Sequence, residues 1–202
     1  MTIKIFVEGG GGGPGSADLQ AQCREGFRGL LMKAGLTYQP RIVACGGRRA
    51  AFDDYCTALR NDEPAMLLVD SEDAVTVGQE NPWGHVASRK GDAWPRPDGA
   101  QDDDLHFMVR CTESWLLADV ATLGVYFGKN FKGNKLPKRP VSDVDRHEAE
   151  KALQQASKDT RKGAYAKGKH SFALLRLVDI ALVRKEPWAD RFFRVAAQRS
   201  KK

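Results

Sequence analysis

Short apolar runs alternate along the first half of the chain with stretches in which apolar residues recur every three or four positions. A short apolar run bounded by polar or glycine residues is typical of a buried strand, and the longer spacing is typical of an amphipathic helix. The expected strands lie at 2–7, 41–45, 65–69 and 105–111, and the expected helices between them at 16–34 and 52–59. The alternation predicts an α/β fold with a mainly parallel four-stranded sheet flanked by helices.

The remainder of the chain has helical spacing with longer polar stretches. Helices are expected from 113 to 123, from 142 to 160, from 172 to 182 and from 187 onward. We therefore expect a catalytic α/β domain over residues 1–125 and a basic helical extension over residues 126–202 packed on it. Residues 74–104 show little periodicity, which predicts a long loop or lid. Trp83 and Trp94 within this segment either anchor the loop or stack on bases.

Acidic residues follow the ends of several predicted strands. Glu8 follows the first strand, Asp70 and Glu72 follow the third, and Glu113 begins the helix after the fourth. The carboxyl ends of parallel strands meet at one edge of a sheet, where open α/β folds bind ligands. Any one of these acids is most simply explained as a helix cap or a solvated residue. Four at one edge favour a site for Mg²⁺ or Mn²⁺, with Asp73 as a competitor of Glu72 for the second ligand position.

The composition is that of an ordinary soluble globular protein, with 42% hydrophobic and 29% charged residues among 202. No apolar run approaches the ~20 residues of a membrane-spanning helix, and no signal-peptide pattern opens the sequence. The four cysteines are widely spaced and form no CxxC pair, which argues against a zinc site. We therefore expect a cytoplasmic protein with reduced cysteines and no membrane association.

Positive charge is concentrated after residue 129, in a chain with a net charge of +6. This balance is compatible with a polyanionic partner such as DNA or RNA. Arg48 and Arg49 lie in a predicted turn after the second strand, and Lys167, Lys169 and His170 form a basic cluster near the C-terminus. All five are candidate contacts to nucleic-acid phosphates. The alternative for each is a solvated loop residue.

A run of glycines at 9–15 follows the first strand. The segment contains no lysine before Ser16, so it is not a P-loop. Its glycines match the GxGxxG spacing of dinucleotide-binding proteins, but a glycine run does so almost trivially, and Pro14 lacks the backbone donor that a phosphate cradle uses. We therefore interpret the run as a flexible loop above the acidic site. The spacing shows no Ser–His–Asp or Cys–His arrangement.

Two of the acidic segments resemble those of TOPRIM domains, the fold of topoisomerases, primases and OLD-type nucleases. They are Val7-Glu8-Gly9 and Val69-Asp70-Ser71-Glu72. The resemblance implies that Glu8 acts as a general acid/base and that Asp70 and Glu72 bind Mg²⁺. Glu72 stands where that family prefers an aspartate, and the glycine run replaces a short turn. These departures put catalytic activity in question more than metal binding.

Two later segments resemble a TOPRIM-like family, domain of unknown function 4276. They are the stretch from Cys111 to Asp119, with the sequence CTESWLLAD, and Tyr165-Ala166-Lys167-Gly168. The relation to OLD-type nucleases implies a catalytic role for Lys167. It also implies a prokaryotic anti-phage defence system with an ABC- or SMC-like ATPase as partner.

The leading expectation is thus a Mg²⁺- or Mn²⁺-dependent nuclease that cleaves phosphodiester bonds of DNA or RNA. One alternative is a non-catalytic adaptor that binds nucleic acid or an ATPase. Another is a phosphotransfer or nucleotide-hydrolysing enzyme that uses the same acids. The sequence leaves the oligomeric state open.

Overall fold

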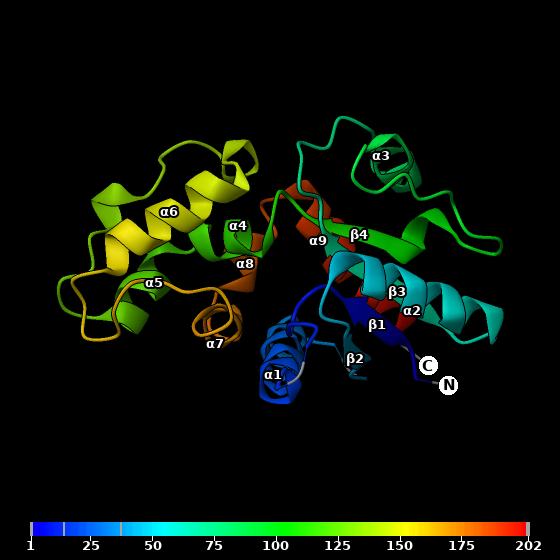
Figure 1. Ribbon diagram of the computed structural model, residues 1–202, viewed down its shortest axis with the longest axis horizontal. Coiled ribbons are helices and arrows are strands. Elements are labelled where there is room, and N and C mark those ends of the chain that lie inside the picture. The colour runs from blue at the N-terminus through cyan, green and yellow to red at the C-terminus, as the bar shows by residue number, and fades with distance from the viewer. Residues whose placement is uncertain (1, 14, 37, 201–202) are drawn as a thin grey trace.

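Four parallel strands form the centre of the computed structural model, which describes residues 2–13, 15–36 and 38–200. The strands are β1 (Lys4–Val7), β2 (Arg41–Ala44), β3 (Ala65–Asp70) and β4 (Leu105–Met108), in the spatial order β2-β1-β3-β4. All three pairings are parallel, with Val7 beside Leu68 and Asp70 beside Met108. The predicted α/β fold with a parallel four-stranded sheet is confirmed (Figure 1).

One face of the sheet packs on α1 (Ala17–Lys33). Alternate strand residues such as Ile5 and Leu68 point to this face, and they share a buried cluster with Phe27 and Leu30 of α1. The same cluster continues through the C-terminal helices as far as Ala196. The two predicted parts of the chain, divided after residue 125, therefore share one hydrophobic core.

The other face is covered by α2 (Arg48–Arg60) and α3 (Pro82–Ser88). Both helices depart from the sequence-based expectation. The predicted turn at Arg48 and Arg49 was wrong, because Gly47 caps the helix and both arginines form its first turn. Residues 74–104 contain α3, a helix of seven residues that is too short to show periodicity; the Asn81 side chain accepts the Gly84 N–H at its start.

The C-terminal half is built from short helices. They are α4 (Thr112–Leu117), α5 (Val120–Phe127), α6 (Arg146–Ser157), α7 (Ser171–Leu175), α8 (Ile180–Val183) and α9 (Pro187–Arg199). Single-turn 3₁₀ helices η1 (Asp102–Asp104), η2 (Gly133–Lys135) and η3 (Val141–Asp143) connect the larger elements. Figure 1 shows α4 to α8 gathered on the left, with the sheet on the right.

Two aspartates divide helices that the spacing predicted as continuous. Asp119 caps α5 by accepting the Thr122 N–H at 2.9 Å, and Asp179 caps α8 by accepting the Ala181 N–H at 2.8 Å. The second oxygen of Asp119 accepts the N–H of Asp179 at 2.9 Å, so the two breaks are joined. The predicted helix start at Ser142 was also wrong, since Asp145 caps α6.

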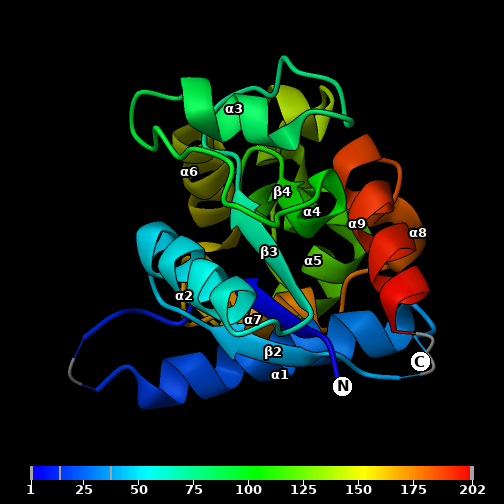
Figure 2. The same ribbon diagram turned by 90° about the vertical axis from the view of Figure 1, so that its right-hand side faces the viewer.

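The last helix closes the fold by packing along β4 (Figure 2). Pro187 opens it as predicted, and Glu186 caps it by accepting the N–H groups of Trp188 and Ala189. Arg191 is buried and donates to the main-chain oxygen of Leu105 at 2.8 Å. The four cysteines are free thiols. Within the described ranges, we find no helix with the length and apolar character needed to span a membrane.

Candidate functional site

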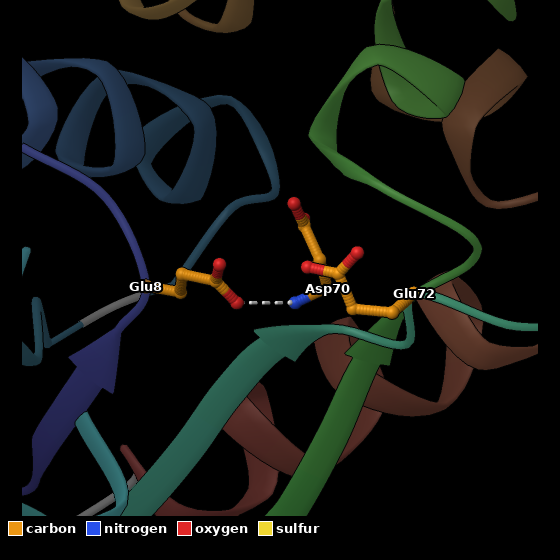
Figure 3. A group of neighbouring side chains, drawn as sticks. All are labelled: Glu8, Asp70 and Glu72. Carbon is orange, nitrogen blue, oxygen red and sulfur yellow. Dashed lines mark hydrogen bonds between the residues drawn. The ribbon is translucent and has the colours of Figure 1, made fainter. Parts of the chain in front are cut away.

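Three carboxylates, those of Glu8, Asp70 and Glu72, meet at the carboxyl edge of the sheet, and we call them the acidic group. One oxygen from each of Glu8, Asp70 and Glu72 lies within 4.8 Å of the other two (Figure 3). Glu8 directly follows β1 and Asp70 ends the neighbouring β3, so the strand register brings them together. The main-chain N–H of Asp70 donates to Oε2 of Glu8 at 3.3 Å. The structure thus gathers three of the four predicted metal ligands.

Asp70 is buried and is held by the start of α4. Its Oδ1 accepts both the main-chain N–H of Thr112, at 2.8 Å, and the Thr112 hydroxyl, at 3.0 Å. The Asp70 carboxylate therefore accepts hydrogen bonds at the N-terminal end of α4, where the helix dipole favours negative charge. Among the described residues, its Oδ2 has one, more distant partner, Nζ of Lys167 at 3.5 Å. One oxygen of Asp70 is thus held by Thr112, and the other lies near Lys167.

Glu72 reaches the group through an unusual backbone turn. Its φ of +65° lies in the left-handed region, which costs a residue with a side chain roughly 1 kcal/mol. The chain therefore does not stay extended beyond the end of β3 but turns at Glu72. Asp73 points elsewhere: it is exposed and accepts from Nε of Arg89 at 2.7 Å. Glu72, rather than Asp73, therefore lies beside Asp70.

Glu113 is buried next to the group but is engaged by other residues. Its Oε1 accepts from the Tyr165 hydroxyl at 2.8 Å, and its Oε2 lies 3.4 Å from Nζ of Lys167. Lys167 therefore bridges Glu113 and Asp70. Glu113 belongs to the same charged cluster, and its role as a metal ligand stays a prediction.

The proximity of these charges shifts several pKa values. Burial raises the pKa of Glu8 to about 7, and the charge of Asp70 adds to this effect more than Arg48 opposes it. Burial also raises the pKa of Asp70, against the influence of Lys167. Burial lowers the pKa of Lys167, but Asp70 and Glu113 outweigh it and raise that pKa above its ordinary value. Lys167 is therefore cationic beside crowded carboxyl groups.

Arg48 is held by protein groups. Its Nε and Nη2 bind both oxygens of Asp92 at 2.8 and 2.6 Å, and its Nη1 donates to the main-chain oxygen of Asp70. The guanidinium also stacks on Trp94, 4.8 Å from the ring centroid. Oε2 of Glu8 is 3.8 Å away. Arg48 thus positions the loop and the acidic edge, and few of its donors remain for a phosphate.

The other predicted phosphate contacts are dispersed. Arg49 lies on the exposed face of α2 and pairs with Asp53 at 3.0 Å. His170 is buried, its Nδ1 accepts the Ala166 N–H at 3.0 Å, and burial lowers its pKa, so it is a neutral core residue rather than part of a basic surface. Lys169 is exposed. Among these basic residues, Lys167 is the one that lines the site.

Arg146, the first residue of α6, is a site residue that was not predicted from the sequence. Its Nη1 lies 2.8 and 2.9 Å from the two carboxylate oxygens of Glu72. The contact joins residues that are 74 positions apart in the chain. The sequence gives only a weak indication of its role, since Arg146 follows the capping residue Asp145 in a segment that is rich in basic residues.

A pocket of about 240 Å³ opens over the acids, and Glu8, Asp70, Arg146 and Lys167 contribute to its wall. Residues 9–11 of the glycine run line it as well. Gly9 and Gly46 exchange two main-chain hydrogen bonds of 2.9 and 2.8 Å, which tie the start of the run to the end of β2. The predicted loop above the acidic site is therefore anchored at its first residue. Pro14 lies outside the described residues.

The architecture is that of an α/β protein with a parallel sheet, which has three converging acids and a pocket at its carboxyl edge. The chain belongs to the family described as "Domain of unknown function (DUF4276)", whose model matches residues 19–195. Asp70, Glu72 and Lys167 fall inside the matched region, whereas Glu8 precedes it. Comparisons with curated proteins and with solved structures gave no match.

Proposed function

We propose that the protein is a Mg²⁺- or Mn²⁺-dependent nuclease that cleaves phosphodiester bonds of DNA or RNA. The observation that carries the proposal is the convergence of Glu8, Asp70 and Glu72, with one oxygen of each within 4.8 Å of the others. Two of these acids, Glu8 and Asp70, line a pocket together with Lys167. The resemblance of the acidic segments to TOPRIM domains and OLD-type nucleases supports the same reaction class.

The residues fit a hard divalent cation. All three side chains offer carboxylate oxygens, which Mg²⁺ and Mn²⁺ prefer. The raised pKa values of Glu8 and Asp70 show that these carboxylates are crowded and partly desolvated. A cation among them would relieve that repulsion. The donor set and its electrostatics therefore suit a metal.

The chain's own residues would share the remaining tasks. When bound, the metal would polarise the phosphate and lower the pKa of a water ligand. Thr112 holds Oδ1 of Asp70, and Oδ2 lies near Lys167. In the metal-free protein the pKa of Glu8 is about 7, so this carboxylate can take up a proton near neutral pH. The resemblance to TOPRIM domains gives it the general acid/base role. Lys167 supplies a fixed positive charge for the phosphate.

The setting we propose follows from the family resemblance alone. It is a cytoplasmic anti-phage defence system in which the protein is the effector and an ABC- or SMC-like ATPase is its partner. The basic extension over residues 126–202 would contribute contacts to the nucleic acid.

The non-catalytic adaptor remains the second candidate, and one observation favours it. Arg146 already pairs with Glu72, and Lys167 already lies between Asp70 and Glu113. Cationic side chains thus neutralise the acids without a metal. In an adaptor, these ion pairs would hold the edge of the sheet together and nothing more.

A cleavage assay separates the two candidates. Plasmid DNA and total RNA are incubated with the wild type, with the Glu8→Gln/Asp70→Asn double variant and with Asp73→Asn, each with and without Mn²⁺. We expect cleavage by the wild type and by Asp73→Asn, only with Mn²⁺, and none by the double variant. Asp73 is the matched control because it lies next to the group yet pairs with Arg89.

Equal behaviour of the wild type and the double variant, with any required ATPase present, would exclude the nuclease. Binding of Mn²⁺, measured by calorimetry, provides a readout that does not need an ATPase partner. A wild-type protein that binds no Mn²⁺ would refute the metal site itself.

A further inference from the structure

Three cationic side chains in the described part of the chain surround the acidic group, and they differ in how firmly they are held. Arg48 is clamped by both oxygens of Asp92 and stacks on Trp94. Lys167 lies between two buried carboxylates. Arg146 pairs with a single carboxylate, through Nη1, and that carboxylate is partly solvated: the Glu72 side chain is 17% exposed, against 2% for both partners of Lys167. Arg146 is therefore the cation that can leave at the lowest cost.

The contact that Arg146 makes is with the atoms that a metal needs. Its Nη1 lies within 2.9 Å of both oxygens of Glu72, and Glu72 is one of the three acids that converge. If an arginine and a divalent cation both bound these oxygens, their positive charges would lie close together and repel each other, so each would weaken the binding of the other. The two are therefore competitors for Glu72.

The position of Arg146 in α6 is not explained by helix stability. It is the first residue of a helix of twelve residues, at the positive end of the helix dipole, where acidic side chains are favoured and cationic ones are disfavoured. The free donors of its guanidinium are Nε and Nη2, for which we find no acceptor among the described residues. Planar arginine donors match the oxygens of a phosphate. The side chain also lines the pocket with Lys167.

We propose that Arg146 is an exchangeable substrate-binding residue. In the metal-free protein it occupies Glu72; when a divalent cation binds, it leaves Glu72 and binds a phosphate of the nucleic acid. This inference rests on the proposed function and adds to it an order of events: the metal makes the phosphate contact available. Metal and nucleic acid then bind with positive coupling, because each favours the same position of Arg146.

Two binding measurements test the exchange. The first is calorimetric titration of Mn²⁺ into the wild type, Arg146→Gln and Arg161→Gln. Arg161 is the matched control, an exposed arginine of the same basic extension whose replacement makes the same change in net charge. We expect Arg146→Gln to bind Mn²⁺ about fivefold more tightly than the wild type, because the competitor of the metal is removed. Arg161→Gln should remain within about twofold.

The second measurement is binding of a fluorescein-labelled phosphorothioate oligonucleotide, which resists cleavage, with and without Mn²⁺. In Mn²⁺, Arg146→Gln should bind about tenfold more weakly than the wild type, the cost of one charged contact. Without Mn²⁺ the two proteins should bind alike, since Arg146 is then engaged with Glu72. A loss of equal size in both conditions would mean that Arg146 acts through its charge alone and would overturn the exchange.

Failure of the exchange and failure of the proposed function give different results in these measurements. If the wild type binds no Mn²⁺, the proposed function itself fails. If the wild type binds Mn²⁺ and Arg146→Gln binds it equally well, the exchange alone is refuted. Should Arg146→Gln not fold, Arg146→Lys answers the same question. Its ammonium lacks the planar fork, so oligonucleotide binding should weaken in Mn²⁺ and stay unchanged without it, and a metal-independent loss would contradict the proposal.

Discussion

Two buried aspartates near the ends of neighbouring strands, Asp70 and Asp104, are treated differently by the fold. Asp104, just before β4, accepts hydrogen bonds from the Tyr55 hydroxyl at 2.9 Å and the Gln101 N–H at 2.7 Å, and it pairs with Arg199. Asp70 has one oxygen bound by Thr112, while the partner of the other in the described part of the chain is Lys167, at 3.5 Å. Asp70 also lies beside Glu8 and Glu72, two further acids.

We interpret the difference as that between a structural carboxylate and one suited to bind a cation. When both oxygens of a buried carboxylate are paired, loss of the carboxylate destabilises the fold, and a further cation would bind it weakly because its charge is already neutralised. A buried carboxylate crowded by others is held at an electrostatic cost, which a bound cation repays. The comparison predicts that substitutions at the two sites separate stability from metal binding.

The largest effect is expected for Asp70→Asn. The replacement keeps the Oδ1 acceptor for Thr112 but removes the charge from the acidic group, so the fold should persist while Mn²⁺ binding is lost. We expect the cleavage rate to fall about a thousandfold, measured as initial rates on supercoiled plasmid beside Asp73→Asn. A decrease of less than about tenfold would show that Asp70 is not a metal ligand.

Asp104→Ala should produce the opposite pattern. The Tyr55 hydroxyl would lose its buried partner and Arg199 its carboxylate, so the free energy of unfolding should fall by about 3 kcal/mol. Urea titrations followed by tryptophan fluorescence measure this change. Mn²⁺ affinity at low denaturant should stay within about twofold of the wild type. Loss of metal binding in a folded Asp104→Ala protein would erase the distinction between the two aspartates.

An intermediate effect is expected from pH, through Glu8. Its pKa is raised from 4.5 to about 7, so the folded protein holds this proton more tightly than the unfolded chain. Stability should therefore decrease as pH rises between these values. The difference in unfolding free energy between the wild type and Glu8→Gln should change by about 3 kcal/mol across this window. Saturating Mn²⁺, which binds the ionised form, should reverse the slope.

Urea titrations at a series of pH values, with and without the metal, measure this effect. Identical pH dependence of stability in the wild type and Glu8→Gln would mean that Glu8 is solvated like an ordinary carboxylate and that the acidic group is not crowded.

The smallest effect is expected for Arg49→Gln. Arg49 is exposed and pairs with Asp53 on the surface of α2, so stability should change by less than about 0.5 kcal/mol. Oligonucleotide affinity should change by less than about twofold. Fluorescence anisotropy over a range of salt concentrations measures both the affinity and its salt dependence. A clear reduction in the salt dependence would restore Arg49 as a phosphate contact, as first predicted from the sequence.

The local pattern of the sequence determined the sheet and much of the acidic edge. The apolar runs that became β1 and β3 are short, continuous and bounded by polar residues, which is a property of the chain itself. Since both strands are parallel neighbours, Glu8, which follows β1, and Asp70, which ends β3, meet at one edge of the sheet. The opening of α9 at Pro187 was also local, because proline fits the first turn of a helix.

Interactions between distant segments decided the rest. The left-handed turn that sends Glu72 to the acids and Asp73 to Arg89 has no signature in either residue type. The burial of His170 depends on the surrounding core and not on the lysines beside it in sequence. Arg146 reaches Glu72 from 74 residues away, because packing of α6 against α4 places its first residue over the pocket. Periodicity describes which face of an element is buried, whereas the pairing of charges depends on which elements the folded chain brings together.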